Sequence, residues 1–469
     1  MHLPEKPVIL GAGPCGLCVG WNFVNDGIPV THLEKQGSIG GLSLTFEDEG
    51  YFFDLGPHNL HPKYEDVKTF LRNMMGDDMK PYDLSMEIVF RKKRVKYPLK
   101  GIHVFRVLPF PVMVHSALNF LFARVMMFLS DPVRDETFED WITNRFGKTL
   151  YNIYFGPYAE KAWKISGSEI SGYVAERRVP VLSLTDYIRR ALKTDLKHKH
   201  SEDGTLDNFY LRKGIGQLSE RFGRDILKEK GRIVLNCDVL TVKGKNNRIE
   251  SVKYQVDGET REEQTDFLFS TIPLSGLIKV LDMDVPDEVR EAAAGLDFCA
   301  ERLVFIKINN SRTDIPTLLY FSDPQIKFNR IYKCHDDCTP KGKSAICVEY
   351  TCDVGDEIWS AEPEKLYNYT TAVLVNHDIL SEKEIQGYAI REIEHAYPRF
   401  RVGFENRMKT VLTYLSSIHN LITLGRQGLF SYANIDDVLR MAFRGYEALN
   451  TLHVKGIDYS DLFPQHINI

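Results

Sequence analysis

Short apolar runs alternate with segments of helical spacing at both ends of the 469-residue chain. Residues 7–10 and 28–33 predict buried strands, and the apolar residues from 17 to 24 between them recur with the spacing of a helix. Towards the C-terminus, residues 420–424 predict another strand and residues 436–449 another helix. Strands that alternate with helices in this way are typical of a doubly wound α/β sheet.

The middle of the chain follows other patterns. Strands are predicted at 232–242 and 248–254, which we expect to form a hairpin, and at 266–272. Alternating apolar and polar positions between residues 296 and 356 predict an antiparallel sheet with one face over a pocket. Helical periodicity predicts further helices, at 136–150, 151–163, 364–376 and 381–396.

Residues 107–129 are the stretch that most resembles a membrane span. A spanning helix needs about 20 nearly uniform apolar residues. This run is interrupted by prolines and polar residues, namely Pro109, Pro111, His115, Asn119 and Arg124. We therefore expect a helix buried in a helical domain, with contact to a membrane surface as the alternative.

A glycine-rich turn follows the first predicted strand. Gly11, Gly13 and Gly16 form a G-x-G-x-x-G pattern, and Pro14 stands at the start of the helix. The first glycine permits a tight bend, the second lets the backbone approach a pyrophosphate, and the third allows close packing of helix and strand. Glu34 lies where a carboxylate usually accepts a hydrogen bond from a ribose hydroxyl. Together these features predict a dinucleotide site.

A second pair of glycines favours FAD over a nicotinamide dinucleotide as the bound cofactor. Lys35 follows the acid, and Gly40, Gly41 and Leu42 come shortly after it, where small residues let the backbone lie beside an extended cofactor. Val239, at the predicted hairpin, is expected to meet the adenine end.

The C-terminal strand is also followed by a glycine turn. Gly425 and Arg426 open this turn, and a helix is predicted to begin close to Asn434 and Ile435. Backbone N–H groups at a helix N-terminus bind phosphate and other electron-rich groups. We expect these residues to contact the far end of the same cofactor.

Composition and charge exclude several classes of protein. The chain is 43% hydrophobic and 26% charged, which excludes a disordered, collagen-like or coiled-coil protein. A net charge of −5 gives no general attraction to nucleic acid or to anionic membranes, although it leaves room for a local basic pocket. Cys15 with Cys18, and Cys334 with Cys338, lack the second half of a zinc site, so we expect structural thiols and no metal. Residues 1–7 do not predict a signal peptide, and a cytoplasmic location is expected.

Several motifs occur in the order seen in UDP-galactopyranose mutases, and the chain resembles that family. The motifs are Glu34 with Gly40-Gly41, residues 56–61 (GPHNLH), 158–163 (YAEKAW), 178–181 (RVPV) and 328–331 (FNRI), Glu349-Tyr350, and Gly425-Arg426 with Tyr432. The mutases belong to a wider set of flavoproteins that includes protoporphyrinogen oxidases and amine oxidases. The first and last 60 residues match this wider set, and the middle motifs favour the mutases.

The resemblance implies a reaction without net redox change. In the mutase family, N5 of reduced FAD attacks the anomeric carbon of a UDP-sugar, and the sugar recloses with the other ring size. It implies that Arg330 and Arg426 grip a diphosphate, because a guanidinium suits bidentate phosphate contact. Tyr350 and Tyr432 would donate to the same diphosphate. Of the remaining matches, His58 would lie against the flavin, with Trp163 and Arg178 at the substrate.

Structural roles compete with these assignments. Arg330 could form an outward salt bridge on its strand, and Arg426 could serve its turn alone. Tyr350 and Tyr432 could be core tyrosines whose hydroxyls are bonded within the protein, and Trp163 could be a core residue.

The sequence departs from the mutase pattern in three places. Leu182 stands where the family's mobile loop has a second arginine, and Asn434 stands where the family has an acid. A basic stretch at 189–200 is either a solvated charged face or a replacement phosphate clamp. These departures leave nucleotide-sugars other than UDP-galactose, and other reactions, open.

The predicted fold is α/β, with a discontinuous Rossmann-type FAD-binding domain, a helical insertion and an antiparallel substrate-binding sheet. The expected bounds are 1–62, 205–280 and 405–469 for the FAD domain, 63–204 for the insertion and 281–404 for the sheet. Three functions are carried forward: a nucleotide-sugar mutase, an FAD-dependent oxidoreductase of amine oxidase or protoporphyrinogen oxidase type, and a flavin-binding protein without turnover. The expected partner is a small-molecule substrate, with NAD(P)H as a candidate reductant and a homodimer as a candidate assembly. No nucleic acid and no transmembrane span are expected.

Overall fold

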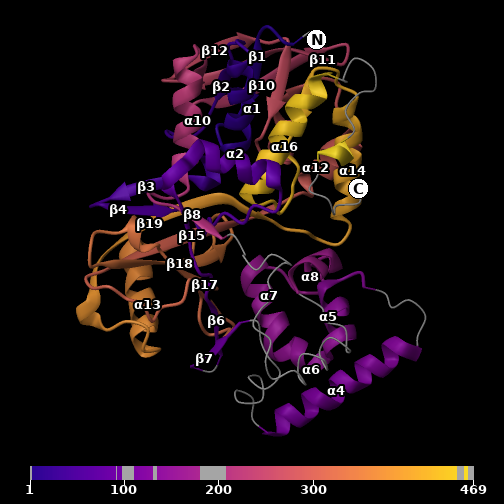
Figure 1. Cartoon of the computed structure of the whole chain (residues 1–469). Helices are drawn as coiled ribbons and strands as arrows, with labels where there is room; N and C mark the ends of the chain where they lie inside the picture. The colour runs from indigo at the N-terminus through magenta and orange to yellow at the C-terminus, as the bar shows by residue number, and fades with distance from the viewer. Residues whose placement is uncertain are drawn as a thin grey trace. The chain divides into compact units, whose positions relative to one another are not determined.

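The computed structural model describes residues 3–90, 92–97, 110–129, 135–179, 208–450 and 459–462. The chain divides into two units, each built from separate stretches of sequence (Figure 1). Unit 1 consists of Met1–Tyr82, Asn208–Phe298 and Phe404–Ile469, and unit 2 of Asp83–Asp207 and Cys299–Gly403. The division therefore differs from the three expected domains: the helical and sheet segments share unit 2, and residues 63–82 and 281–298 lie in unit 1.

The centre of unit 1 is a parallel five-stranded sheet in the order β20-β13-β1-β2-β9. Its strands are β1 (Pro7–Leu10), β2 (Thr31–Leu33), β9 (Arg232–Val234), β13 (Phe267–Ser270) and β20 (Leu421–Thr423). Every residue of β1, β13 and β20 is buried, which explains why these strands are almost entirely apolar. Strands from the beginning, middle and end of the chain thus lie side by side, as the predicted discontinuous α/β fold requires.

The helices of unit 1 pack against one another through aromatic contacts. Trp21 of α1 meets Phe222 of α10 with ring centroids 6.1 Å apart, and Phe23 of α1 meets Tyr446 of α16 at 4.8 Å. Phe70 of α2 contacts Phe443 of α16 at 5.0 Å, so the segment after residue 63 belongs to unit 1. The helices of unit 1 are α1 (Pro14–Asn25), α2 (Glu65–Met75), α10 (Gly216–Lys228), α11 (Leu274–Val280), α12 (Asp287–Ala294), α14 (Phe404–Ser416), α15 (Gly425–Gly428) and α16 (Ile435–Glu447).

A second sheet of unit 1 has the order β12-β11-β10-β14. It contains the predicted hairpin as β10 (Asp238–Lys245) and β11 (Arg248–Val256), followed by β12 (Glu259–Gln264) and β14 (Leu281–Asp282). The single strand expected at 232–242 is wrong. It is split into β9 and β10 because the backbone at Asn236 enters the left-handed region, with φ of 52°. Two short pairs complete the unit: β3 (Thr45–Asp48) with β4 (Tyr51–Asp54), and β5 (Met79–Pro81) with β8 (Phe209–Leu211).

Unit 2 contains a seven-stranded sheet in the order β19-β15-β18-β17-β16-β6-β7. Its strands are β6 (Met86–Phe90), β7 (Lys93–Lys96), β15 (Phe298–Ile308), β16 (Leu318–Phe321), β17 (Arg330–Lys333), β18 (Ser344–Cys352) and β19 (Ile385–Pro398). The pairs β15–β18, β18–β17 and β17–β16 are antiparallel, as predicted, whereas β16 and β6 are parallel.

The helix predicted at 381–396 is wrong, because residues 385–398 form the long strand β19. Apolar residues such as Ile390 and Ile393 have helical spacing, which misled the prediction. The segment lies next to β15 in the sheet, and pairing with a neighbouring strand overrides local periodicity. The short 3₁₀ turn Glu382–Glu384 precedes it.

The helices of unit 2 follow the predicted ranges more closely. They are α4 (Phe110–Leu129), α5 (Phe138–Phe146), α6 (Lys148–Leu150), α7 (Gly156–Trp163), α8 (Gly172–Arg178) and α13 (Pro363–Asn376), with a π-helical turn, η3, at Tyr151–Phe155. The expectation that the apolar helix is buried is wrong: α4 exposes most of its large apolar side chains. Within the described part of the chain, no helix is long and apolar enough to cross a membrane.

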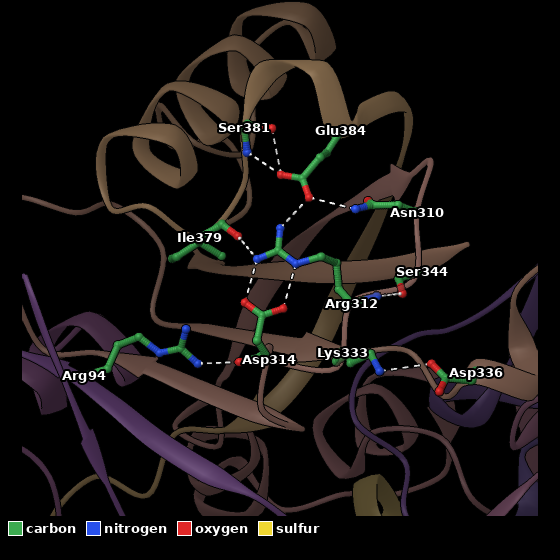
Figure 2. Close-up of polar contacts among 10 residues, drawn as sticks. All are labelled: Arg94, Asn310, Arg312, Asp314, Lys333, Asp336, Ser344, Ile379, Ser381 and Glu384. Atoms are coloured by element: carbon green, nitrogen blue, oxygen red, sulfur yellow. Dashed lines mark hydrogen bonds and ion pairs between the residues drawn. The ribbon is translucent and has the colours of Figure 1, made fainter. Parts of the chain in front are cut away.

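Arg312 ties two loops of unit 2 together (Figure 2). Its Nε and Nη2 donate to the two carboxylate oxygens of Asp314 at 2.7 Å each, and its Nη1 donates to Glu384 at 2.7 Å. Glu384 also accepts from the backbone N–H of Ser381, and these hydrogen bonds lower the pKa of its carboxyl to about 2. The cluster thus fixes the turn before β19 against the loop after β15.

Candidate functional site

The first glycine turn has the backbone geometry that a pyrophosphate site requires. Gly11 has φ of +97°, and a Cβ there would lie 2.4 Å from Thr271 Oγ1. A Cβ at Gly16 would lie 2.4 Å from the carbonyl oxygen of Gly11, so α1 can approach β1 only with glycine at this position. A Cβ at Gly13, in contrast, would meet nothing within 4 Å. The chain therefore leaves open space beside Gly13, where a pyrophosphate fits.

The N-terminus of α1 is prepared for negative charge. Gly13 is the N-cap and provides no capping side chain, Pro14 begins the helix, and the first turn contains no acid. The N–H groups and the positive end of the helix dipole can therefore act on phosphate oxygens instead.

Glu34 holds the glycine turn from the end of β2. It is 7% exposed, and its two carboxylate oxygens accept from the backbone N–H groups of Ala12 at 2.7 Å and Gln36 at 2.8 Å. The segment after β9 runs alongside, because Cys237 N donates to the carbonyl of Glu34 at 2.9 Å. Val239 follows two residues after Cys237, at the start of β10, and is partly buried. Lys35, the residue after Glu34, is exposed.

The second glycine pair packs directly on the first turn. Gly40 and Gly41 have φ of +116° and +52°, and Gly40 N donates to the carbonyl of Ala12 at 2.8 Å. A Cβ at Gly41 would lie 3.4 Å from Gly13 Cα. Leu42 follows in the 3₁₀ turn η1 (Gly41–Ser43) and is partly buried. The two predicted glycine motifs are thus one backbone surface.

The C-terminal glycine turn also reaches this surface. Gly425 has φ of +85°, and a Cβ there would lie 3.1 Å from Cys15 Cβ in the first turn of α1. Arg426 Nη1 donates to the carbonyl of Ala433 at 3.1 Å, and its guanidinium lies 4.4 Å from the ring centre of Tyr432. The structure therefore brings the two glycine turns together and stacks Arg426 on Tyr432.

The N-terminus of α16 is already capped by its own side chains. Asn434 and Asp437 form a capping box, in which Asn434 N donates to Asp437 at 3.1 Å, and Ile435 is buried behind it. Asp436 in the same turn is 2% exposed and accepts from Lys63 N, and burial raises the pKa of its carboxyl. Position 434 lacks the acid of the mutase family, but two acids, Asp436 and Asp437, lie in the first turn of α16. This feature did not enter the prediction from the sequence.

His58 lies in a turn after β4. Its Nε2 is 3.1 Å from the carbonyl oxygen of Leu55, within the same turn, and the residue is partly buried. This local contact fixes the ring, and the predicted role beside a flavin remains a proposal.

In unit 2, Arg330 sits in a buried polar cluster. Its Nε and Nη2 donate to Glu349 Oε2 at 2.9 and 2.5 Å, across the neighbouring strands β17 and β18. Nη2 also donates to Tyr397 at 3.1 Å, and the guanidinium lies 6.0 Å from the ring centre of Tyr320. Burial raises the pKa of the Glu349 carboxyl, and the charge of Arg330 opposes that rise.

Tyrosines surround this ion pair. Tyr158 of α7 meets Tyr320 edge-on at 6.2 Å, and burial raises the pKa of its hydroxyl. On the same helix, Lys161 Nζ donates to the carbonyls of Phe321 and Asp323, and burial lowers its pKa to about 8. Glu349 and Tyr158 stood in the motifs quoted above, but Tyr320 and Tyr397 carried no sequence signal, because only pairing of the strands brings them to Arg330.

Tyr350 does not fit its predicted contact with a diphosphate. It is 0% exposed and lies in the hydrophobic core of unit 2, where its hydroxyl is 2.7 Å from Thr370 Oγ1. Successive residues of a strand point to opposite faces, so Glu349 faces Arg330 and Tyr350 faces away. The structural alternative noted from the sequence is the one observed.

Trp163 and Arg178 end two helices of unit 2. Trp163 closes α7, is partly buried and packs against Phe138 with ring centroids 6.2 Å apart. Arg178 is the last residue of α8. Leu182 and the basic stretch at 189–200 lie outside the described residues.

All eight cysteines are buried, and none forms a disulfide. Among the described residues, no group of three or more His, Cys, Asp or Glu side chains could hold a metal ion.

The site geometry defines a class of protein before any comparison is made: one that binds a dinucleotide on a glycine-lined parallel sheet. The comparisons agree. The family model described as "Flavin containing amine oxidoreductase" matches residues 14–411, and the chain belongs to that family. It is an FAD-dependent enzyme of the amine oxidase superfamily.

Individual relatives point in two directions. A probable UDP-galactopyranose mutase of Klebsiella pneumoniae is 26% identical over 188 residues, which cover 37% of this chain and 44% of that protein. The match thus spans less than half of the curated relative. A crystal structure of reduced UDP-galactopyranose mutase covers 96% of each chain with a TM-score of 0.81 at 19% identity. The structure of a putative protoporphyrinogen oxidase from Exiguobacterium sp. 255-15 covers 95% of this chain and 98% of that one, with a TM-score of 0.71 at 15% identity. At these identities the structures show a shared fold.

Proposed function

We propose that the protein is a nucleotide-sugar mutase that uses reduced FAD to interconvert pyranose and furanose rings. The FAD held by unit 1 would supply the nucleophilic ring nitrogen of this reaction. The residues of the chain would bind the diphosphate, orient the sugar and exclude water.

One observation carries the proposal: in the part of the chain that the structure describes, hydrogen bonds from the Arg330 guanidinium to protein groups involve only its Nε and Nη2. Glu349 and Tyr397 take its Nε and Nη2, and within the described residues its Nη1 makes no hydrogen bond. A buried carboxylate that fixes a guanidinium in this way orients the remaining N–H groups for a ligand, and a diphosphate is the ligand such groups bind well. The tyrosines around Arg330 add rings that can stack on a nucleobase or donate to phosphate.

The direct test is turnover of a nucleotide-sugar panel. The holoenzyme is reduced with dithionite and incubated with UDP-, dTDP- and GDP-hexopyranoses, and the products are separated by chromatography of their ring isomers. We expect ring-isomer formation with at least one sugar, only after reduction. Activity that needs no reduction, or no ring isomer from any sugar, would contradict the proposal.

Nucleotide binding gives a second measurement, because the chain contains four tryptophans whose fluorescence reports ligand binding. Replacing Arg330 with alanine should weaken nucleotide affinity by about 2–5 kcal/mol, as expected when one partner of a buried charge contact is removed. Arg330→Lys keeps the charge and tests the geometry. Arg312→Ala is the matched control, since this arginine belongs to the same unit but is committed to Asp314 and Glu384.

A second candidate is an FAD-dependent oxidoreductase of the amine oxidase or protoporphyrinogen oxidase type. The family description favours it, and so does the Arg330–Glu349 pair, whose opposite charges can cancel without an anionic ligand. Oxygen consumption with an amine or a tetrapyrrole, together with no nucleotide effect on fluorescence, would select this candidate over the mutase.

A further inference from the structure

Helix α4 of unit 2 displays an apolar face that is exposed among the described residues. Among the described residues, eleven large apolar side chains are exposed, and seven of them stand on this one helix. The seven are Phe110, Val114, Leu118, Leu121, Phe122, Val125 and Met126, with exposed fractions from 41% to 71%. The other four are scattered over separate elements, so α4 carries the main exposed apolar surface of the described chain.

The two buried side chains of α4, among those that the structure describes, are both small. Ser116 and Ala123 are the buried positions, and Asn119 approaches Gly147 so closely that a Cβ on that glycine would lie 2.9 Å from its backbone. A helix of a globular core normally turns its large apolar residues inward. The reversed order in α4 indicates that the outward face is built for contact with something other than this fold.

The seven residues form a continuous stripe. Their spacing of three and four residues places them on one side of a helix that is about 30 Å long. A helix with this length and an apolar stripe can lie in the plane of a membrane interface with its apolar side in the lipid. The absence of a span-forming helix from the described residues agrees with a surface position.

The charge around α4 selects among lipid surfaces. The chain as a whole is acidic, with a net charge of −5, yet residues 88–130 contain eight Lys and Arg and no Asp or Glu. Lys92, Lys93 and Lys96, at the hairpin that precedes α4 in the sequence, are exposed. Basic residues close to an anionic bilayer are attracted to its head groups.

We propose that α4 is a peripheral membrane anchor, which lays its apolar stripe on a bilayer with anionic head groups, assisted by the basic hairpin at β7. The inference stands apart from the proposed function, because it rests on a surface of unit 2 that contains none of the residues assigned to the nucleotide-sugar. It would place the enzyme beside lipid-linked or membrane-bound reaction partners, whichever reaction it performs.

The experiment is flotation of the full-length holoenzyme with vesicles. Vesicles of phosphatidylcholine alone are compared with vesicles of equal parts phosphatidylcholine and phosphatidylglycerol, at low and at high salt. We expect the protein to float with the anionic vesicles at low salt and to be released by high salt. Protein that stays at the bottom with both vesicle types at low salt, or that floats equally with both, contradicts the proposal.

One triple variant and a matched control locate the contact. The triple variant Leu118→Asp, Leu121→Asp, Phe122→Asp should lower vesicle partitioning by about tenfold or more, because charged residues oppose insertion of the stripe. Leu227→Asp is the control, since Leu227 is 58% exposed on α10 in unit 1 and should float like the wild type. A triple variant that floats normally overturns the proposal.

A fluorescence reporter keeps the test valid if the triple variant is unstable. Phe122→Trp should shift its emission to the blue when anionic vesicles are added, and an unshifted emission counts against insertion. Sedimentation in the absence of lipid tests whether the apolar face of α4 binds a second copy of the chain instead. If the wild type is a dimer that the triple variant converts to a monomer, and neither binds vesicles, α4 is an interface between two copies and the anchor proposal is wrong.

Discussion

Replacing Gly13 with alanine separates cofactor binding from folding. A Cβ at Gly13 would meet no protein atom within 4 Å, and the backbone there, with φ of −74°, suits any residue. The apoprotein should therefore keep its melting temperature. We expect the pyrophosphate of FAD to lie in the open space beside Gly13, so the added methyl group should weaken FAD binding alone.

The expected loss follows from the cost of forcing a methyl group into a filled space, about 1–3 kcal/mol. Since each 1.4 kcal/mol is tenfold in affinity, the dissociation constant for FAD should rise roughly 5- to 150-fold. The assay is titration of the apoprotein with FAD, followed by quenching of flavin fluorescence, next to thermal melts of the same samples.

Gly16→Ala is the matched comparison. Its Cβ would lie 2.4 Å from the backbone oxygen of Gly11, so this variant should lose both stability and FAD affinity. If Gly13→Ala binds FAD as tightly as the wild type, the pyrophosphate does not pass beside Gly13, and the reasoning about the glycine surface is refuted.

Three further predictions concern unit 2. Arg312→Ala should cost about 1.5–3 kcal/mol of stability at neutral pH, because it removes the charged hydrogen bonds to Asp314 and Glu384. Arg312 lowers the pKa of the Asp314 carboxyl to about 2, so this contribution is present above the unfolded value of 3.8 and is lost as the pH falls. Melts at low pH should therefore show a smaller difference from the wild type. Tyr350→Phe should lower the free energy of unfolding by about 0.5–1.5 kcal/mol, measured with denaturant, because the Tyr350 hydroxyl forms its hydrogen bond in the core. Nucleotide affinity should not change. A loss of nucleotide affinity would show that Tyr350 contacts the nucleotide. Arg330→Ala removes the charge that opposes the burial-driven rise of the Glu349 pKa, so the pKa of this carboxyl should rise further in the variant. The destabilisation should therefore grow towards about 3–5 kcal/mol as the pH rises above the already raised pKa that Glu349 has in the wild type. A pH-independent difference in melting temperature would contradict this account.

The cofactor surface was predictable from the sequence because each of its parts has a local signal. Gly11, Gly16 and Gly40 have positive φ or no room for a Cβ, and such positions select glycine wherever they occur. The strands β1, β13 and β20 are short and mostly apolar, so they too could be recognised one by one.

The substrate cluster was only partly predictable, because it is made by strand pairing. Arg330 was found through its motif, but Tyr320 and Tyr397 come from strands whose neighbours are set by tertiary contacts. The same cause misplaced Tyr350, since motif position does not tell which face of β18 a residue occupies. It also led to the wrong helix at 381–396, where an ambiguous periodicity was settled by pairing in the sheet.

The strand order of unit 1 has a consequence for biosynthesis. β20, at residues 421–423, is the edge strand beside β13, and Gly425 after it packs on Cys15 at the other end of the chain. Domains usually fold one after another as the ribosome releases them. Here the N-terminal strands stay incompletely covered until residues 421–425 have been translated. We therefore expect the cofactor surface to be complete only after this late segment has left the ribosome.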